Sequence, residues 1–547
     1  MPIQSGTPIE RVRELVQTFS ADDADPAWLM CDRHPAANVA FTIVEPDGSS
    51  TAITFAELRE RSERFAGVLR DLGVGYGDRV ATLMGKSADL VTVLLGIWRL
   101  GAVYVPLFTA FAADAATSRL DGADAKVVVA DATQSVKLVP ADRTLIVAGE
   151  AGDVPEGAYR LGDLLATATP FSQSTPIGGD GDFVHMFTSG TTGTPKGVVH
   201  PLRYVAGWQS YLEFALGVPT DGVYWCGADP GWAYGLYSAI VAPMMLGIGS
   251  VLQRGGFDPA STWSAITSLG VTDFSAGPTV YRSLRLSDVP IPENHRLQRL
   301  SSAGEPLTAE VNEWLQPALG LEVHDHYGQT EVGMVVGFPQ HPALNMPVRP
   351  QTMGVALPGW TITVLREDDH TPADVGESGL LAVEIASSPL MTFTGYAGGV
   401  SAASRFTPDG THYLTGDIAT RNADGTLRFS SRDDDVIIMA GYRIGPNDVE
   451  SVLVQHEAVA ECAVVAGPDA VRGEVLEAFV VLRSDTDASD SLVKELQQLV
   501  RERYAAHAYP RRVHVVPSLP KTASLKVQRS KLRQQLRDAY AAQQTNE

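Results

Sequence analysis

Thr188-Ser-Gly-Thr-Thr-Gly-Thr-Pro-Lys-Gly197 is the stretch that says most about the fold of this chain. Its glycines allow backbone N–H groups to turn inward and form a nest for an anion, and its hydroxyl groups add donors. Lys196 supplies a mobile positive charge for a phosphate. The stretch is not the P-loop GxxxxGK[ST], because Pro195 precedes the lysine and Gly197 follows it. Composition alone leaves a flexible surface turn as the alternative.

The whole chain has the composition of an ordinary globular protein. It has 547 residues, and at about 150 residues per domain we expect two to four domains. The formal net charge of −22 argues against a protein that coats nucleic acids or anionic membranes. The three cysteines, Cys31, Cys226 and Cys462, lie too far apart for a disulfide framework or a zinc site, which suits a reducing compartment.

Two segments bear on the location of the protein. The N-terminus has early acidic residues and no apolar core of a signal peptide, so we expect no secretory signal. Residues 230–253 carry no charged side chain and have the length of a membrane span, but Pro243 interrupts them and no basic flank accompanies them. We interpret this stretch as buried core and expect a cytoplasmic protein with no membrane span and no nucleic-acid partner.

The first part of the chain alternates between helical and strand patterns. Thr54 and Glu57 form a capping-box pair, and an apolar helical face follows. A buried strand at residues 79–84, a helix around 90–100 and an apolar segment at 102–107 come next. This order predicts an α/β fold with a parallel sheet and helices on its faces. Further strand-like stretches lie at residues 126–130, 250–251, 271–275 and 322–324.

The character of the sequence changes near residue 430. The dense charge cluster that begins at Arg432 is typical of a linker between domains. The elements expected after it are a helix at 447–456, strands at 462–466 and 478–482, a helix at 491–504 and a strand at 513–516. We therefore predict two domains, 1–431 and 432–547, of which the second is a small α+β domain.

The order of residues 188–197 resembles the phosphate loop of the adenylate-forming superfamily, which includes acyl-CoA synthetases, peptide-synthetase adenylation domains and firefly luciferase. Further stretches resemble other motifs of this superfamily, in its order: Ser302-Ala-Gly-Glu-Pro-Leu307, His324-Asp-His-Tyr-Gly-Gln-Thr-Glu331, Tyr413-Leu-Thr-Gly-Asp417, Arg432-Asp-Asp-Asp-Val-Ile-Ile-Met-Ala-Gly-Tyr-Arg-Ile-Gly-Pro446 and Leu519-Pro-Lys-Thr-Ala-Ser-Leu-Lys526. The resemblance covers the chain from about residue 50 to its end. It implies a luciferase-like fold, with a large N-terminal domain of parallel and mixed sheets with helices and a small mobile α+β domain.

The resemblance also implies a two-step reaction that uses ATP, Mg²⁺ and coenzyme A. A carboxylate is a poor electrophile, because its leaving group would be oxide, and attack on the α-phosphate of ATP makes an acyl-adenylate whose leaving group is AMP. The residues assigned in this way to ATP or AMP are Thr188, Ser189, Gly190, Thr191, Thr192, Gly193, Lys196, Gly304, Glu305, Pro306, Asp325, His326, Tyr327, Gly328, Gln329, Thr330, Asp417, Arg432, Arg443 and Lys526.

Within this set, the resemblance gives individual roles. Residues 304–306 line the adenine, and Tyr327 stacks on it. Thr330 bonds the α-phosphate, whereas Asp417 and Arg432 bind the ribose. The residues with catalytic roles are Thr188 in the phosphate loop, Glu331 as the hard oxygen ligand of Mg²⁺, and Lys526.

Lys526 resembles the lysine that bridges the attacking carboxylate and the α-phosphate in the transition state, where it stabilises developing charge. The chain departs from the family at one neighbouring position, because Leu525 stands where the family usually has glycine. A backbone with φ > 0 at that position would make leucine costly. This departure suggests, as an alternative, a catalytically weak protein that binds acyl nucleotides.

The C-terminal domain supplies the residues of the second step. Asp434 matches the hinge on which the family's domain turns, and Ala440, Gly441 and Tyr442 flank the tunnel for the CoA thiol. In acetate-type relatives a second metal is held in this domain, and Val454, His456 and Val459 correspond to its ligands. Eight basic residues and no acidic residue lie between residues 505 and 537, and there we expect contacts to the CoA phosphates.

The acyl pocket is expected around Trp232, Gly277 and Gly328. Asp229-Pro-Gly-Trp-Ala-Tyr-Gly235 resembles the corresponding stretch of the short- and medium-chain acyl-CoA synthetases. Acetate-specific relatives carry a bulky tryptophan at the position of Gly328, so glycine there predicts an acid larger than acetate, which is medium-chain, branched or aromatic. No aspartate is placed to pair an amino group, which disfavours an amino-acid substrate.

The sequence thus predicts an ATP- and Mg²⁺-dependent acid–CoA ligase that acts as a monomer or homodimer. A rival interpretation is an enzyme that loads the pantetheine arm of a carrier protein, because both thiols would use one tunnel. The alternating histidines His324 and His326 have no third ligand near them in the sequence, so we expect no metal there.

Overall fold

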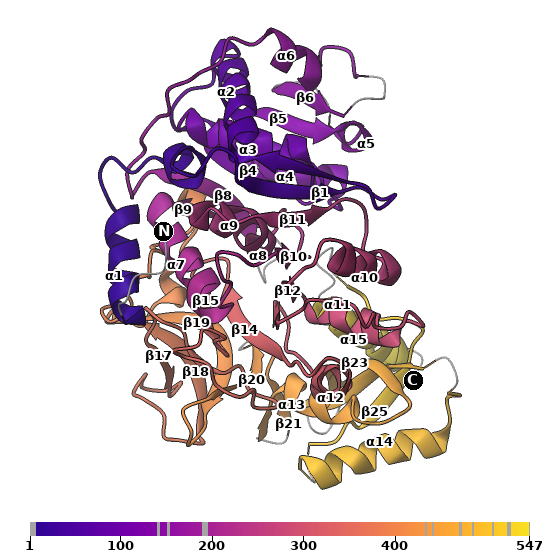
Figure 1. The fold of residues 1–547 in the computed structure, drawn as a ribbon. Helices are drawn as coiled ribbons and strands as arrows, with labels where there is room; N and C mark the ends of the chain where they lie inside the picture. Colours follow the sequence, from indigo (N-terminus) through magenta and orange to yellow (C-terminus); the bar gives the residue numbers. More distant parts are fainter. Residues whose placement is uncertain are drawn as a thin grey trace.

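The computed structural model (Figure 1) describes residues 7–138, 143–149, 154–188, 195–432, 435–439, 442–469, 473–483, 486–505, 508–521 and 527–545. Two large sheets form its frame. The nine-stranded sheet has parallel pairing through its middle and antiparallel pairing at both edges. Its strands, in spatial order, are β16 (Val355–Ala356), β15 (Gly333–Gly337), β14 (Val323–Gln329), β13 (Arg299–Ala303), β12 (Asp273–Ala276), β10 (Tyr224–Cys226), β11 (Ser250–Gln253), β1 (Val39–Val44) and β2 (Ser50–Thr54).

The second sheet has seven strands among the described residues, and only its last pair is antiparallel. In spatial order they are β7 (Tyr159–Arg160), β6 (Thr144–Ala148), β5 (Ala125–Asp131), β3 (Arg79–Leu83), β4 (Val103–Pro106), β8 (Asp182–Thr188) and β9 (Lys196–Pro201). The prediction of an α/β fold with parallel strands is confirmed.

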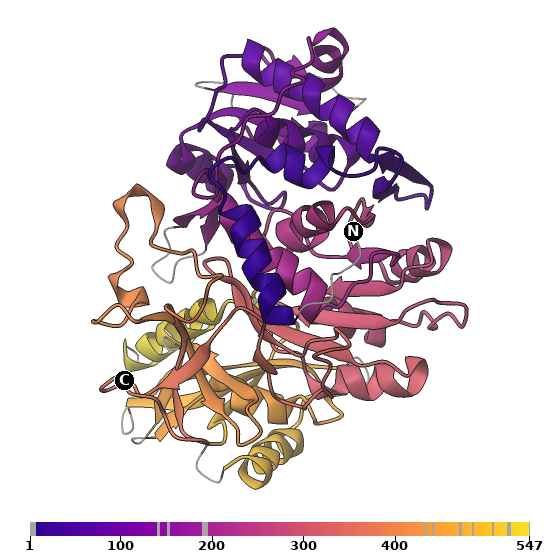
Figure 2. The same ribbon diagram turned by 60° about the vertical axis from the view of Figure 1, so that its left-hand side comes forward.

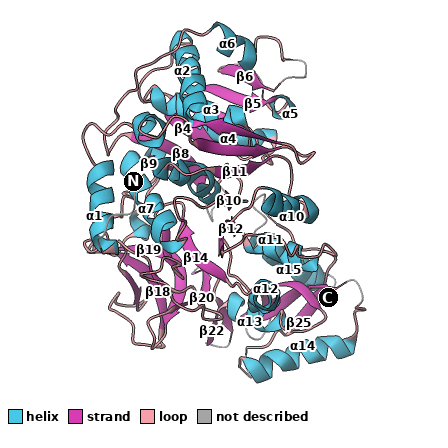
Figure 3. Cartoon of the chain, in the orientation of Figure 1, coloured by secondary structure: helices cyan, strands magenta, loops and turns pink. Residues whose placement is uncertain are grey.

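Helices cover both faces of these sheets (Figure 3). On the seven-stranded sheet, α2 (Phe55–Asp71), α3 (Ala88–Arg99) and α6 (Leu161–Thr167) cover one face, and α4 (Ala113–Ala123) and α5 (Ala132–Ser135) cover the other. On the nine-stranded sheet, α10 (Pro259–Ser268), α11 (Pro278–Leu286) and α12 (Ala309–Leu319) cover the outer face.

A single large core joins the two sheets. It contains the inner faces of both sheets and a set of helical segments between them. These are α1 (Pro8–Phe19), the π-helices η1 (Trp28–Asp32), η3 (Tyr211–Ala215) and η4 (Tyr237–Val241), the short helix η2 (Leu202–Tyr204), α7 (Val205–Ser210), α8 (Ala233–Leu236) and α9 (Ala242–Leu246). Figure 2 shows α1 running along this central region. The uncharged stretch 230–253 forms α8, η4, α9 and β11 and is largely buried, as predicted.

A four-stranded antiparallel sheet follows the nine-stranded sheet in the chain. Its strands are β17 (Ile362–Leu365), β18 (Ser378–Glu384), β19 (His412–Arg421) and β20 (Leu427–Arg432). The short helices η5 (Ala397–Gly399) and η6 (Ala403–Arg405) lie in the connection between β18 and β19.

The rest of the chain has hydrophobic cores of its own. Its elements are the hairpin β21 (Ile437–Met439) and β22 (Tyr442–Ile444), the sheet of β23 (Val459–Asp469), β24 (Gly473–Leu482) and β25 (Arg512–Val515), and the helices α13 (Pro446–Leu453), α14 (Asp490–Arg503) and α15 (Arg529–Thr545). Separate cores agree with a separate domain, and the division at residue 431 stays a prediction.

Several local predictions can be checked against these elements. The capping box is confirmed, because Thr54 Oγ1 accepts from the Glu57 N–H and the Glu57 carboxylate accepts from the Thr54 N–H. The helix predicted at 447–456 begins at Pro446 but ends at Leu453, so His456 lies beyond it. Within the described residues, no helix combines the length and the apolar character that crossing a membrane requires.

Candidate active site

The predicted site residues meet at the turn that joins β14 to β15. Gln329 is the last residue of β14, and Thr330 and Glu331 form the turn that follows it. Each of these three residues is bonded to a different part of the molecule, and together the contacts bring all three N-terminal sheets to one point. The sequence predicted the three residues as neighbours in a motif, and the structure adds what surrounds them.

Gln329 connects the turn to the four-stranded sheet. Its side-chain amide donates to the backbone oxygen of Thr415 at 2.8 Å and to the carboxylate of Asp417 at 2.7 Å. The hydroxyl group of Tyr413 donates to the Gln329 side-chain oxygen at 3.0 Å. Tyr327, two residues earlier on β14, donates its hydroxyl to the same Asp417 carboxylate. The two motifs that carry Tyr327 and Asp417 are therefore bonded to each other.

Thr330 connects the turn to the seven-stranded sheet. Its carbonyl oxygen accepts from His200 Nε2 at 2.7 Å and from the Tyr204 hydroxyl at 2.9 Å. Because a carbonyl oxygen can only accept, His200 carries its proton on Nε2, and its Nδ1 accepts from the Tyr237 hydroxyl at 2.8 Å. Burial lowers the pKa of His200 to about 3, so this histidine is neutral.

Glu331 lies in a polar cluster that the sequence did not predict. Its carboxylate is buried and accepts from the Tyr396 hydroxyl at 2.9 Å. Arg405 donates to that hydroxyl from Nε at 3.1 Å and to the Thr415 carbonyl oxygen from Nη1 at 2.7 Å. Burial and the nearby Glu331 charge raise the pKa of Tyr396 to about 12, so its hydroxyl keeps the proton that it donates.

Tyr396 also contacts the phosphate-loop lysine. The ammonium group of Lys196 lies 5.0 Å from the centre of the Tyr396 ring, in cation–π geometry. Tyr396 thus touches both a predicted phosphate ligand and the predicted metal ligand. A lone tyrosine in a glycine-containing loop carries no signal in a single sequence, which is why sequence reasoning missed Tyr396 and Arg405.

The phosphate loop begins and ends on paired strands. Thr188, the last residue of β8, lies directly opposite Lys196, the first residue of β9. A side chain at Gly197 would have to displace the His185 ring, because a Cβ atom would lie 2.4 Å from His185 Nε2. The loop residues Ser189, Gly190, Thr191, Thr192 and Gly193 lie outside the described residues. The structure therefore describes the two sides of the predicted loop.

The segment 304–306, predicted to line the adenine, lies after the carboxyl end of β13. Gly304 has φ +104°, and a Cβ atom there would contact nothing within 4 Å. A left-handed backbone with open space beside it fits a glycine over which a ligand can lie. The Glu305 carboxylate accepts from the Thr279 hydroxyl at 2.7 Å and from Arg282 at 2.8 Å, whereas Pro306 is exposed.

Asp325 and His326 are both buried in β14, and their side chains differ in what they can offer a ligand. Asp325 accepts at one oxygen from the Leu307 N–H at 3.2 Å, and its other oxygen is buried with no partner among the described residues. His326 accepts from the Tyr211 hydroxyl at Nδ1 and donates from Nε2 to the Phe338 carbonyl oxygen. Both ring nitrogens of His326 thus form hydrogen bonds within the protein. A contact of His326 with ATP, as predicted, would therefore have to come from its backbone.

Asp417 and Arg432 are opposite each other on β19 and β20. Asp417 is buried and accepts the two hydrogen bonds from Tyr327 and Gln329. The two residues that the sequence assigns to the ribose, 15 positions apart in the chain, are therefore cross-strand neighbours.

The predicted acyl residues have different surroundings. Trp232 packs its ring against Phe108 and Phe111, at centroid distances of 5.4 and 5.8 Å. At Gly277, a Cβ atom would meet only the Ala303 carbonyl oxygen, at 3.9 Å, so a small side chain would find room there.

Gly328 does not leave the open space that the sequence suggested. A Cβ atom there would lie 2.2 Å from the Gly333 carbonyl oxygen and 2.8 Å from the Met334 Cα. The backbone of β15 passes so close to β14 here that a side chain at this position would require the hairpin to shift. The inference from Gly328 to a longer acid is therefore corrected, because the close approach of the two backbones explains the glycine at this position.

Several predicted residues fall where little or nothing is described. Lys526, Asp434, Ala440 and Gly441 lie outside the described residues. Only the backbone of Tyr442 and Arg443 is described, in β22, where they pair with Met439 and Ile438. Their roles stay predictions.

The residues predicted for the second metal lie between α13 and β23, and this site stays a prediction. Val454 is the C-cap residue of α13, Val459 begins β23, and His456 between them accepts at Nδ1 from the Ala458 N–H. Over the part of the chain that the structure describes, no group of three or more His, Cys, Asp or Glu residues could hold a metal ion. His324 and His326 belong to no such group among the described residues.

The basic stretch near the C-terminus is less available than its charge suggests. Four of its members form ion pairs within the C-terminal part of the chain, at 2.8 Å or less: Arg512 with Glu477, Lys521 with Glu461, Arg529 with Glu450, and Arg533 with Asp435. The prediction that this stretch binds CoA phosphates therefore rests on fewer charges than the sequence indicated.

Comparison with known families gives two matches. Residues 30–396 match the model of the AMP-binding enzyme family, and residues 448–526 match that of the AMP-binding enzyme C-terminal domain. The acetyl-coenzyme A synthetase of Bacillus subtilis is 35% identical over 496 residues, which cover 88% of this chain and 84% of that protein.

Solved structures of similar proteins cover nearly the whole chain. An acyl-CoA synthetase of Brucella canis is 38% identical, with a TM-score of 0.74 over 97% of this chain and 99% of that one. The anthranilate CoA ligase AuaEII, solved in complex with anthranoyl-AMP, is 26% identical, with a TM-score of 0.84 over 94% of this chain and 98% of that one.

The buried carboxyl group of Asp325 leads to a prediction about pH. Burial raises its pKa to about 8, whereas an aspartate in an unfolded chain has a pKa of about 4. Between these values the folded protein binds more protons than the unfolded chain, so the stability from this group is complete below about pH 4 and is lost as the pH rises through about 8. Asp325→Asn removes this titration. We expect its melting temperature, relative to the parent, to rise between pH 5 and pH 9 in thermal unfolding.

Asp71→Asn is the control for this series, because Asp71 forms an exposed ion pair with Arg70. Its difference from the parent should stay nearly constant over the same range. A difference for Asp325→Asn that does not change with pH would contradict the assignment.

Proposed function

Because this chain belongs to the AMP-binding enzyme family and is an AMP-forming acid–CoA ligase, we propose that its substrate is a carboxylic acid larger than acetate, which is medium-chain, branched or aromatic. The observation that carries the adenylation site is the convergence of three sheets on residues 329–331. The proposal on acid size is supported by the room at Gly277, the aromatic cluster of Trp232, and the likeness to a ligase solved with anthranoyl-AMP.

ATP, Mg²⁺ and CoA are the substrates and cofactor of this family. Glu331 fits Mg²⁺, because it presents a buried carboxylate whose one oxygen is fixed by Tyr396. Magnesium is commonly bound by one or two carboxylates together with water and phosphate oxygens, so a single such residue suffices. When bound, the ion neutralises charge on the phosphates. Lys196 lies near Glu331, because its ammonium group contacts the ring of Tyr396, which binds Glu331.

In the first step, a carboxylate oxygen of the acid attacks the α-phosphorus of ATP. A bond forms between that oxygen and phosphorus, and the bond to the bridging oxygen of pyrophosphate breaks. We assign the β- and γ-phosphates to Thr188, Lys196 and the loop between them, and the α-phosphate to Thr330. Asp417 and Arg432 hold the ribose, and Lys526 stabilises the transition-state charge between the two reacting groups.

In the second step, the sulfur of CoA attacks the acyl carbon, the thiol loses its proton, and AMP leaves with the former carboxylate oxygen. We assign the thiol's path to Ala440, Gly441 and Tyr442 and the change between the two steps to a turn at Asp434. Loading of a carrier protein is the alternative for this step. The oligomeric state, monomer or homodimer, and a cytoplasmic location stay predictions.

A panel of acids tests the proposed substrate class. Acetate, hexanoate, 2-methylbutanoate and benzoate are compared by CoA-dependent AMP release, with holo-carrier protein as a second acceptor. We expect kcat/KM for at least one larger acid to exceed that for acetate about ten-fold or more, because each buried methylene is worth roughly 0.8 kcal/mol. If acetate were the best substrate, the proposal on acid size would be wrong. Faster transfer to the carrier protein would favour the alternative acceptor.

Lys526→Ala tests the adenylation lysine in isotopic exchange between pyrophosphate and ATP, driven by the acid. Loss of one charge that acts in the transition state should lower the exchange rate by about 10²-fold or more. Lys521→Ala is the control, because Lys521 pairs with Glu461 at 2.8 Å. Equal exchange in Lys526→Ala and the parent would sink the assignment, and no exchange in the parent would favour a protein that only binds acyl nucleotides.

Tyr396→Phe tests the positioning of Glu331. The variant keeps the ring under Lys196 but removes the hydroxyl that donates to Glu331, so the Mg²⁺ concentration for half-maximal activity should rise about ten-fold or more. The KM for the acid should change little. Phe393→Leu is the control, because its ring packs 5.2 Å from that of Tyr396 and makes no hydrogen bond. An unchanged Mg²⁺ dependence in Tyr396→Phe would remove this role.

A further inference from the structure

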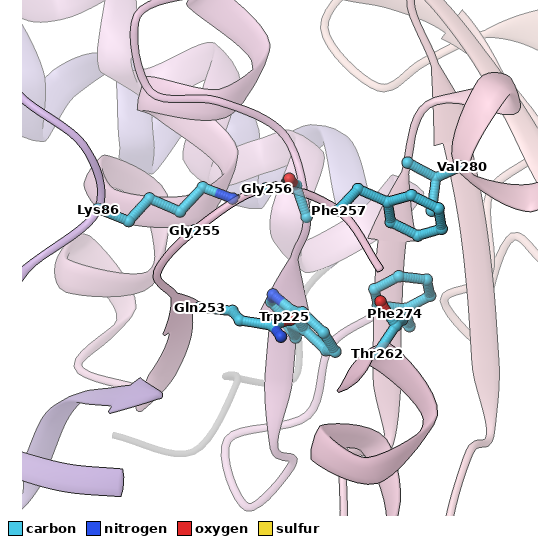
Figure 4. Close-up of a pocket in the computed structure, with 10 residues that line it drawn as sticks. Lys86, Trp225, Gln253, Gly255, Gly256, Phe257, Thr262, Phe274 and Val280 are labelled. Carbon is cyan, nitrogen blue, oxygen red and sulfur yellow. Dashed lines mark hydrogen bonds between the residues drawn. The ribbon is translucent and has the colours of Figure 1, made fainter. Parts of the chain in front are cut away.

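A small cavity lies at the carboxyl ends of β10, β11 and β12, outside the residues assigned above (Figure 4). Its volume is ≈ 60 Å³. Trp225 and Phe274, with ring centroids 5.0 Å apart, form one side, and Phe257 closes another. The carboxyl ends of parallel strands are where open α/β sheets bind their ligands. The position and the aromatic lining both favour a binding site.

One cation reaches into this apolar cavity. Lys86 follows β3 and enters from the side opposite Phe274 and Val280 in Figure 4. Its ammonium group donates to the Gly227 carbonyl oxygen at 2.9 Å. Among the described residues no carboxylate lies within ion-pair distance of it, and the buried Asp229 carboxyl acts on it electrostatically from farther away. An ammonium group has three N–H donors, so one carbonyl oxygen leaves donor capacity unused.

A second donor lies in the same cavity wall. The indole Nε1 of Trp225 is buried and has no hydrogen-bond partner among the described residues. Burying a charge or a polar group without a partner costs free energy, and an acceptor that enters the cavity would recover part of that cost. Two unsatisfied donors, one of them charged, therefore select an anion.

The cavity adjoins the segments that we assign to the acyl group. Gly227, which receives the Lys86 bond, lies two residues before Asp229. A Cβ atom on Gly227 would lie 3.8 Å from Ala276, the neighbour of Gly277 in the chain. A group bound beside Lys86 is thus next to the predicted acyl pocket.

We propose that this cavity is an anion subsite in which Lys86 and Trp225 bind a carboxylate or phosphate group, with the apolar part of the same substrate against Phe257 and Phe274. This inference rests on the proposed function and adds a recognition element to it. The anion has two possible sources, a second carboxylate on the acid or a phosphate group of CoA, and both present the same chemistry to an ammonium group.

Lys86→Met tests the subsite, because methionine keeps an unbranched apolar side chain and removes the charge. One arm compares benzoate with terephthalate in acid-dependent exchange between pyrophosphate and ATP, without CoA. The other arm compares CoA with pantetheine, which lacks the phosphates of CoA, in thioester formation from benzoate. We expect Lys86→Met to weaken one anionic partner, terephthalate or CoA, about ten-fold or more in kcat/KM. The counterpart that lacks the extra anionic group, benzoate or pantetheine, should change less than two-fold, and Lys86→Arg should restore part of the loss.

The pattern of results identifies the source of the anion. A loss confined to terephthalate assigns the subsite to the acid, and a loss confined to CoA assigns it to the thiol substrate. Lys126→Met is the control, because Lys126 is an exposed lysine paired with Asp78. Equal losses for both members of each pair, or no loss in either arm, would overturn the proposal.

Calorimetric titration of terephthalate and CoA into the parent and Lys86→Met keeps this test independent of catalysis. The variant should bind one of the two at least ten-fold more weakly, and equal affinities would reject the subsite. A parent that binds both ligands but shows no exchange with any acid would instead count against the proposed function.

Discussion

The turn at residues 329–331 is the contact on which the arrangement of the N-terminal sheets depends. Gln329 bonds to the four-stranded sheet, the Thr330 carbonyl oxygen to His200 on the seven-stranded sheet, and Glu331 to Tyr396 in the connection between β18 and β19. The turn itself belongs to the nine-stranded sheet. A shift of one sheet would therefore break hydrogen bonds to buried polar groups, which costs more than the loss of apolar contact alone. The geometry of the site and the packing of the domain are set by the same bonds.

This arrangement explains which parts of the site could be read from the sequence. The motifs around Thr188, Glu331 and Asp417 combine residue types whose chemistry is specific, and the pairing of Asp417 with Arg432 across two strands agrees with a shared ligand. Tyr396 and Arg405 could not be found in this way, because their roles come from contacts made only after folding. His326 and Gly328 show the reverse case. Both residues stand within a motif, but the His326 ring is hydrogen-bonded to Tyr211 and Phe338, and the backbone of β15 lies against Gly328.

The predictions of the fold divide in the same way, into features that depend on local sequence patterns and features that depend on contacts between distant segments. The capping box at Thr54, the alternation of strands with helices and the uncharged stretch 230–253 depend on patterns within a short window, and their predictions were confirmed. The sequence predicts that α13 ends at residue 456, three residues beyond its observed end at Leu453. Helix ends depend on tertiary contacts, which a local sequence pattern does not contain. The antiparallel pairing of β14 with β15 brings the two backbones close together at Gly328, and this spacing has no signature in a single sequence.

The two buried histidines beside the turn have a consequence for how the site meets its substrates. His200 and His326 each donate from Nε2 to a carbonyl oxygen and accept at Nδ1 from a tyrosine, and burial lowers the pKa of each to about 3. They act as fixed dipoles with one direction, since neither gains a proton near neutral pH. Phosphate groups do change charge in that range. These two histidines therefore keep a constant hydrogen-bond polarity, and changes of charge near neutral pH come from Asp325 and from the molecules that enter the site.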